Sequence, residues 1–285
     1  MKKVVLISIL ATCLASAAFG QYESNAVTYY EEDHVYNKDA VKQRPVIPQC
    51  FMREADVKYY RRIHRIIDVR QKLNHCLTWE RGPFAKVLWD NVLNGNLTPY
   101  KNDSISPTSM YTAEDILSMS GAEELIRIPG PNYPDDPEDI RDTTIQKLFD
   151  FKSIIKYRVM EDWVFDYQRS VFEPRIIAIA PYYKPTFAGV TSSFEIEFFW
   201  IKMSNFRPIL SNAELFNRSN DAARLTYDDF FMLRLFDSYV IKESNERDWK
   251  INEFPEFKDD GVGALLESDR VKNDLFIFEH DMWQY

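Results

Sequence analysis

The acidic side chains around Trp163 are the group in this sequence that could most directly carry out chemistry. Glu161 and Asp162 stand before this tryptophan, and Asp166 follows it. A pair of carboxyl groups flanking a glycosidic bond is the machinery of most glycoside hydrolases. The chain contains 44 Asp and Glu residues, however, so acidic residues are equally expected here on a surface or at a strand end. The group supports a hypothesis of glycan hydrolysis or glycan binding without defining a motif.

The other reactive side chains lack the spacing that catalytic and cofactor sites require. The chain has 8 glycines and contains no glycine-rich phosphate-binding motif, no G-x-S-x-G and no H-E-x-x-H. Its 4 histidines are too few to favour a catalytic triad or a metal cluster. His280 lies between Glu279 and Asp281, whose side chains point in different directions on a helix, so a structural role is favoured. We therefore predict no catalytic residue, no cofactor and no metal site.

Two cysteines remain once an N-terminal export signal is removed. Cys50 and Cys76 can pair as a disulfide in an oxidising compartment. This bond would tie the N-terminal arm to the end of the first predicted helix. The alternative is two unpaired thiols, which are common core residues. His75 adjoins Cys76, but two adjacent side chains do not match the ligand spacing of a zinc site.

Residues 1–20 have the pattern of a cleaved signal peptide. Lys2 and Lys3 precede an apolar run, and Ala18, Phe19 and Gly20 form a small-x-small cleavage site. The alternative is a lipoprotein signal ending at Cys13, but the apolar run before it is short. Later apolar runs are too short to span a bilayer, which takes about 18 or more residues. We expect a secreted or periplasmic protein.

The net charge argues against nucleic acid as a partner. Cleavage after Gly20 removes Lys2 and Lys3 and takes the formal charge from −9 to −11. Phosphate groups would repel a chain this acidic, because it has no long basic run. Aromatic residues make up 15% of the sequence. This excess fits a subunit of an assembly, since Tyr and Trp are favoured at interfaces, and fits an aromatic core equally well.

Residues 21–48 are predicted to form an extended N-terminal arm. The segment is polar and shows no sustained apolar periodicity. Such an arm is either disordered or ordered by contact with another surface. Its amphipathic side chains are candidate partner-binding residues: Tyr22, Tyr29, Tyr30 and Tyr36.

A first helix is predicted from Ala55 to Leu73. Its apolar residues, which include Tyr59 and Ile63, would share one side. Its arginines would crowd the other sides and form the most basic patch of the chain, with Arg61, Arg62 and Arg65 as further candidate partner-binding residues. The alternative is an ordinary solvated helix face with local ion pairs.

A long central helix is predicted over residues 226–242. Thr226 and Asp229 have the spacing of a capping box at its start. Met232, Phe236 and Val240 would lie on its core face, although Tyr239, Val240 and Ile241 also favour a strand. Shorter helices are expected after Pro83, ending at Asn94 and Gly95, and after Thr112. A last helix should place Ala264, Val271, Leu275, Phe278 and Met282 on one side.

The second half of the chain contains the strand patterns. They are found at residues 155–159, 175–180 and 194–201, where apolar and polar residues alternate or form short apolar runs. Alternation favours antiparallel pairing. We therefore predict an α+β fold in which an antiparallel sheet from the second half packs on helix 226–242 and flanking helices. Residues 49–285 would form a single globular domain, with a Pro- and Asp-rich surface loop at 129–139.

Several phrases in this order resemble the GldN/PorN family of gliding motility and type IX secretion proteins. The resemblance spans most of the mature chain. It is carried by RIIDVRQKLN (65–74), EDWVFD (161–166), RIIAIAP (175–181), FWI (199–201), FNRSNDAARLTYDDFFMLR (216–234), KESN (242–245), LLESDRVK (265–272) and EHDMW (279–283). The loop at 129–139 and the two mature cysteines depart from the family pattern.

The resemblance implies a non-enzymatic subunit in the periplasm, at the inner face of the outer membrane. Family members bind an outer-membrane lipoprotein of the GldK/PorK type and form a ring with it. They also meet the periplasmic part of a GldM/PorM-like motor subunit. The alternative from another class is a secreted glycan hydrolase or glycan-binding protein that uses the carboxylates around Trp163.

Overall fold

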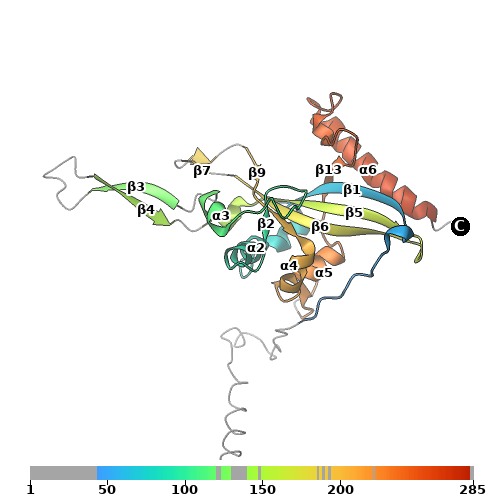
Figure 1. Cartoon of the computed structure of the whole chain (residues 1–285), viewed down its shortest axis with the longest axis horizontal. Helices are drawn as coiled ribbons and strands as arrows, with labels where there is room; N and C mark the ends of the chain where they lie inside the picture. Colours follow the sequence, from blue (N-terminus) through green and yellow to red (C-terminus); the bar gives the residue numbers. More distant parts are fainter. Residues whose placement is uncertain are drawn as a thin grey trace, which may run out of the picture. The chain divides into compact units, whose positions relative to one another are not determined.

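A long antiparallel sheet organises the computed structural model (Figure 1). The structure describes residues 44–119, 123–129, 140–146, 149–184, 186–187, 190–191, 194–220 and 222–282, which belong to one compact unit. The strand order is β13-β1-β5-β6-β10-β2, and β9 also pairs with β6. The strands are β1 (Val57–Asp68), β2 (Pro99–Tyr100), β5 (Lys156–Asp166), β6 (Val171–Tyr183), β9 (Ile196–Glu197), β10 (Trp200–Lys202) and β13 (Tyr239–Glu243).

Strand β1 corrects the helix predicted over residues 55–73. Its 12 residues pair along their length with β5 on one side, and Ile63–Ile66 pair with β13 on the other. Tyr59, Ile63 and Ile67 suit a strand, because aromatic and β-branched side chains pack well on a pleated surface. The sheet is therefore not built from the second half alone. The strands predicted at 155–159 and 175–180 are confirmed, and 194–201 forms the short β9 and β10.

Two hydrophobic cores cover the two ends of one face of the sheet. Side chains alternate along a strand, so Ile63 and Ile67 point to the same face, yet Ile67 packs in the first core and Ile63 in the second. Helices α2 (Phe84–Leu93), α4 (Met203–Leu210) and α5 (Tyr227–Met232) cover the first core, and α6 (Gly261–Met282) covers the second. Because long strands twist, α6 lies above the sheet in Figure 1 and α4 and α5 lie below it.

The central helix predicted over residues 226–242 is wrong in length. The capping box at its start is confirmed, with the Thr226 hydroxyl accepting from the Asp229 amide at 3.2 Å. Helix α5 ends at Met232, because Arg234 adopts a left-handed backbone with φ of 54°. The amides of Arg234 and Leu235 bond back to the carbonyls of Phe231 and Phe230, as in a Schellman motif. The chain then turns and returns as β13.

The remaining helix predictions agree with the structure. Helix α2 begins after Pro83 and is followed by Gly95, whose φ of 72° suits glycine. Thr112 and Asp115 cap α3 (Ala113–Met119) through reciprocal hydrogen bonds. Helix α6 includes the segment predicted as the last helix, and the predicted inward residues pack in the second core. The α+β class with a large antiparallel sheet is confirmed.

Short hairpins and 3₁₀ helices complete the described part of the chain. Three two-stranded sheets pair β3 (Glu123–Pro129) with β4 (Ile140–Gln146), β7 (Thr186–Phe187) with β8 (Val190–Thr191), and β11 (Glu214–Leu215) with β12 (Leu225–Thr226). The 3₁₀ helices are η1 (Glu54–Asp56), η2 (Lys72–Thr78), η3 (Phe151–Ser153) and η4 (Ile251–Glu253). Of the predicted loop at 129–139, only Pro129 lies within the described residues.

Candidate functional site

Glu161 is enclosed by three side chains at the junction of the two cores. Its Oε2 accepts from Arg65 Nε at 3.1 Å, from Arg234 Nη2 at 3.1 Å and from Trp163 Nε1 at 3.2 Å. Its Oε1 lies 3.0 Å from Arg234 Nη1, though without hydrogen-bond geometry. The guanidinium carbons of Arg65 and Arg234 lie 5.7 and 5.6 Å from the centre of the Trp163 ring. We call these four residues the Glu161 cluster.

Three members of the Glu161 cluster are buried, and only Arg234 is partly exposed. Glu161 is 0% exposed and Arg65 4% exposed. Burial lowers the pKa of Arg65, and the like charge of Arg234 adds to this, while Glu161 opposes it. A buried carboxylate is tolerated only when cations and hydrogen bonds replace its hydration. Glu161 therefore serves to hold two arginines between the cores and has no access to a substrate.

Asp162 and Asp166 lie on the opposite face of β5 from Glu161. Asp162 accepts two hydrogen bonds from Arg62, at 2.7 and 2.9 Å, and one from the Tyr60 hydroxyl at 3.2 Å. Asp166 accepts from Arg169 Nε at 2.7 Å, and this bond holds the pKa of Asp166 below its usual range. Alternation along β5 thus separates Glu161 from the two aspartates. Asp162 and Asp166 share a face but stand four residues apart, about 13 Å along the strand, which is wider than the separation of two glycosidase carboxylates.

The three arginines predicted as a basic patch are dispersed by the strand. Arg61 and Arg65 share the face of the Glu161 cluster, and Arg62 lies on the other face. Arg61 pairs with Glu243, and Arg62 pairs with Asp162. Arg65 is buried and cannot contact a partner, so its assignment as a surface residue is corrected. The side chains of Arg61 and Arg62 are 41% and 38% exposed, and partner binding by these two remains a prediction.

A second buried polar group lies around His64, on the face of Asp162. Neither His64 Nδ1 nor Arg158 Nε has a hydrogen-bond partner among the described residues. Arg158 pairs with Glu197, which also accepts from the Tyr182 hydroxyl at 2.7 Å. Burial, with Arg158 and Lys242 nearby, lowers the pKa of His64 to about 3. His64 is therefore a neutral core side chain at physiological pH.

The two cysteines are both free in the structure. Cys50 is exposed, whereas Cys76 lies buried in η2 and packs in the first core. Of the two alternatives considered for them, the structure has the unpaired thiols. Burial raises the pKa of the Cys76 thiol, which makes it less reactive. Among the residues that the structure describes, no group of His, Cys, Asp and Glu side chains is arranged to hold a metal ion.

Residues 44–50, which we call the strap, lie extended on the folded body. Arg44 Nη1 pairs with Asp229 Oδ2 at 2.6 Å. The carbonyl of Ile47 accepts from Arg207 at 2.7 Å, and that of Cys50 accepts from Arg175 at 2.6 Å. The end of the predicted arm is thus fixed to the body. Tyr22, Tyr29, Tyr30 and Tyr36 lie outside the described residues, and so does the predicted signal peptide.

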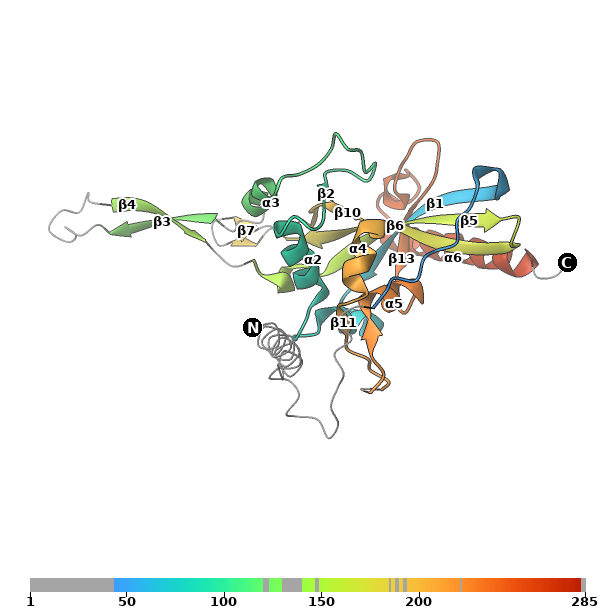
Figure 2. The same ribbon diagram turned by 60° about the horizontal axis from the view of Figure 1, so that its bottom comes forward.

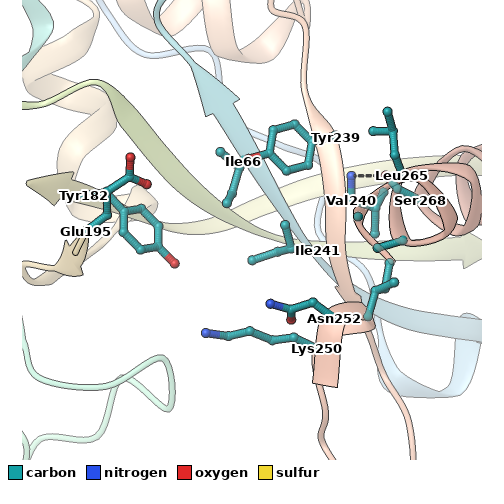
Figure 3. A pocket seen from close by; sticks show the side chains of 13 residues that line it. Ile66, Tyr182, Glu195, Tyr239, Val240, Ile241, Lys250, Asn252, Leu265 and Ser268 are labelled. Carbon is teal, nitrogen blue, oxygen red and sulfur yellow. Dashed lines mark hydrogen bonds between the residues drawn. The ribbon is translucent and has the colours of Figure 1, made fainter. Parts of the chain in front are cut away.

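One cavity of about 340 Å³ lies beside β13. Figure 3 shows its lining side chains on both sides of this strand, with Leu265 and Ser268 of α6 on one side and Tyr182 and Glu195 on the other. The Ser268 hydroxyl accepts from the Val240 amide at 2.8 Å and so caps part of the edge of β13. The cavity contains no set of groups that resembles a catalytic centre.

The surface of α6 was missed as a functional feature by sequence reasoning. Its outward side carries exposed apolar residues, namely Val262, Leu265, Leu266, Phe276 and Ile277. We call these five residues the outer stripe. The pattern was present in the sequence, because apolar residues of this segment fall on two opposite sides of a helix. Only the inward side was used for the prediction.

Comparison with known proteins places the chain in a family. The family model described as Gliding motility associated protein GldN matches residues 52–284, which is most of the chain. No curated protein matches it. Among the described helices, none combines the length and the apolar character needed to cross a bilayer. The chain belongs to the GldN family and is a component of the gliding motility and type IX secretion machinery.

Proposed function

We propose that the mature protein is a non-enzymatic structural subunit of this machinery, located in the periplasm at the inner face of the outer membrane. It forms a ring together with an outer-membrane lipoprotein of the GldK/PorK type. It also contacts the periplasmic part of a GldM/PorM-like motor subunit. Family membership over residues 52–284 supports the machinery to which the subunit belongs. The formation of a ring, the identity of the partners and cleavage after Gly20 are proposals that go beyond family membership.

A structural role is supported by which charged side chains are paired inside the fold and which apolar side chains are exposed. Glu161, Asp162 and Asp166 are each bound by arginine, so they stabilise the fold and are not presented to a substrate. Large apolar residues are instead exposed, among them Phe51 and the outer stripe of α6. Exposed apolar patches mark surfaces that bind other proteins. No observation favours the glycan-directed alternative.

The proposal is tested by isolating the protein with its partners from membranes. We expect co-purification with an outer-membrane lipoprotein and ring-shaped particles in negative-stain images. Small particles without a lipoprotein would contradict the ring. Turnover of a glycan that is abolished by Asp162→Asn, with the fold unchanged, would favour the hydrolase instead.

The N-terminal arm is proposed to add affinity for a partner or a neighbouring copy. The strap contacts of Arg44 and Ile47 show where the arm can be removed without disturbing the body. A chain beginning at Gln43 should unfold at the same temperature as one beginning at Gln21, but co-purify less with the lipoprotein. A chain beginning at Gln49 loses the strap contacts and should unfold at a lower temperature. Equal co-purification of the Gln43 and Gln21 chains would make the arm a passive tail.

A further inference from the structure

Helix α6 has two apolar sides, and only one of them is covered. The helix has 22 residues, and successive residues are rotated by 100° about its axis. The side that packs in the second core carries Ala264, Val271, Leu275 and Phe278. The outer stripe falls on the opposite side. In Figures 1 and 2 the outward side of α6 meets no other described element. The helix is therefore built to contact something on each side.

The outer stripe consists of two exposed apolar groups. Val262, Leu266 and Phe276 are 69%, 64% and 66% exposed, and Leu265 and Ile277 are each 53% exposed. Val262, Leu265 and Leu266 lie in the first two turns of α6, and Phe276 and Ile277 lie about 15 Å further along, with Asp269 and Asn273 between the two groups on the same side. Exposed apolar groups paired in this way mark an interaction site. A second helix packed along α6 can contact both groups at once.

We propose that the outer stripe of α6 binds an amphipathic helix of a partner protein, and that this helix carries Lys and Arg beside its own apolar face. The charges on α6 select this occupant. Five acidic residues lie along the helix against two basic ones, with the acidic set being Glu267, Asp269, Asp274, Glu279 and Asp281. Arg270 is already bound by Glu267 and Asp274. The remaining acidic residues, of which Asp269 lies between the two apolar groups, attract a basic partner and set its orientation.

The same charges disfavour the other occupants of an apolar helix face. A second copy of α6 would bring like charges together. A ring also requires two different surfaces of each subunit to meet, so the stripe would not bind itself. A membrane surface favours helices rich in Lys and Arg beside the apolar face, whereas α6 carries only two basic residues against five acidic ones.

The cavity beside β13 gives the partner helix an anchoring point. Leu265 belongs to the outer stripe and also lines this cavity, together with Ile241 and Ile251. A large apolar side chain of the partner that enters here would be enclosed on several sides, as binding hot spots are. Glu195 also lines the cavity, but Lys156 already pairs with it at 2.6 Å and Lys250 lines the cavity as well, so the cavity itself offers mainly apolar contact.

The inference deepens the proposed function and rests on it, because it assigns a protein partner of the machinery to one surface. The surface itself can be tested without the machinery. The probes are three fluorescent synthetic peptides of about 18 residues. The first is a helix with a leucine stripe and lysine flanks, the second has glutamate in place of lysine, and the third is a scramble of the first. Binding to the chain starting at Gln21 is measured by anisotropy at low and high salt.

The lysine peptide is expected to bind, and to bind less tightly at high salt, while the other two peptides bind at least about tenfold more weakly. Combining Leu266→Ser with Phe276→Ser should weaken binding by about tenfold or more. Both side chains are exposed, so this variant should unfold at the wild-type temperature. The matched control is Leu73→Ser, which alters an exposed leucine outside the stripe, 52% exposed, and should leave binding unchanged.

The proposal is wrong if the lysine and glutamate peptides bind equally, or if binding survives the double substitution. It is also wrong if the protein forms a dimer in sedimentation that the double substitution abolishes. Binding of the stripe to vesicles of anionic lipid would identify a membrane as the occupant instead. The outcomes remain separable from the proposed function. If membrane extracts contain rings but the peptide does not bind, only the proposed role of the outer stripe is rejected. If the peptide binds but no rings are found, the proposed ring is rejected and the role of the outer stripe stands.

Discussion

Glu161 and Asp162 are neighbours in the sequence and have the same charge, yet they face opposite sides of the sheet. Glu161 faces the junction of the two cores, where it is 0% exposed and holds two arginines and Trp163. Asp162 faces the other side of β5, where its side chain is 13% exposed and holds Arg62, whose side chain is 38% exposed and reaches water. A strand separates adjacent side chains by turning them to opposite faces. Residue type and proximity in sequence therefore say little about the role of a carboxylate until its face is known.

The largest effect should come from Glu161→Gln. This change removes the negative charge from the Glu161 cluster and leaves two arginines, one of them buried, without a counter-ion. Removing one member of a buried ion pair costs about 3 to 5 kcal/mol of the free energy of unfolding. Urea denaturation measures this loss. A loss no larger than that of Asp162→Asn would mean that the two carboxylates are equivalent after all.

On the face of Asp162, His64 should couple stability to pH. Its pKa in the folded protein is lowered to about 3, through burial and the charges of Arg158, Lys242, Arg62 and Lys250. His64 therefore takes up a proton near pH 6.5 in the unfolded chain, but only near pH 3 in the folded protein. Above about pH 6.5, protonation of His64 does not reduce the free energy of unfolding. As the pH decreases from 6.5 toward 3, it lowers this free energy by about 1.4 kcal/mol per pH unit.

The substitution His64→Phe should remove this acid sensitivity while keeping a ring against Trp200. At pH 5 the wild type should have lost about 2 kcal/mol relative to pH 7 through His64, and the variant should lack this part of the loss. Thermal unfolding of both proteins at the two pH values provides the measurement. Parallel losses in wild type and variant would show that other groups cause the acid sensitivity.

Arg234 offers a test of how the Glu161 cluster shapes the backbone. Alanine and glycine at position 234 both remove the contact with Glu161, but only glycine adopts the φ of 54° without strain. Arg234→Gly should therefore be more stable than Arg234→Ala by about 1 kcal/mol. Chemical denaturation of the two variants side by side measures the difference. A more stable alanine variant would imply that the turn after α5 changes once the arginine is gone.

The smallest effect should come from Asp162→Asn. Arg62 keeps water as an alternative partner, so the loss should be about 1 kcal/mol or less. The midpoint of thermal unfolding is sufficient to measure it, with Glu161→Gln as the reference. A large loss would show that the face of Asp162 is as sensitive to substitution as the face of Glu161.

The sequence alone determined the features that depend on residues close together in the chain. The capping residues Thr226 and Asp229 mark the start of α5, as Thr112 and Asp115 mark that of α3, because each box is closed within four residues. The inward side of α6 follows from its periodicity in the same way, and its outer stripe could have been found by the same count. The acidic residues around Trp163 were considered for a glycan-directed role, but their pairing with arginines was not predictable from their types.

Tertiary structure decided the features that depend on contacts distant in sequence. The segment of Arg61, Arg62 and Arg65 becomes a strand because β5 and β13 pair with it, and Arg65 can be buried only because Glu161 lies on the adjacent strand. The end of α5 is decided likewise. No glycine marks it, and Arg234 turns the chain there while its side chain reaches Glu161, 73 residues away. A local pattern cannot contain this information, because the energy that offsets the strained backbone and the buried charge comes from residues that only the fold brings together.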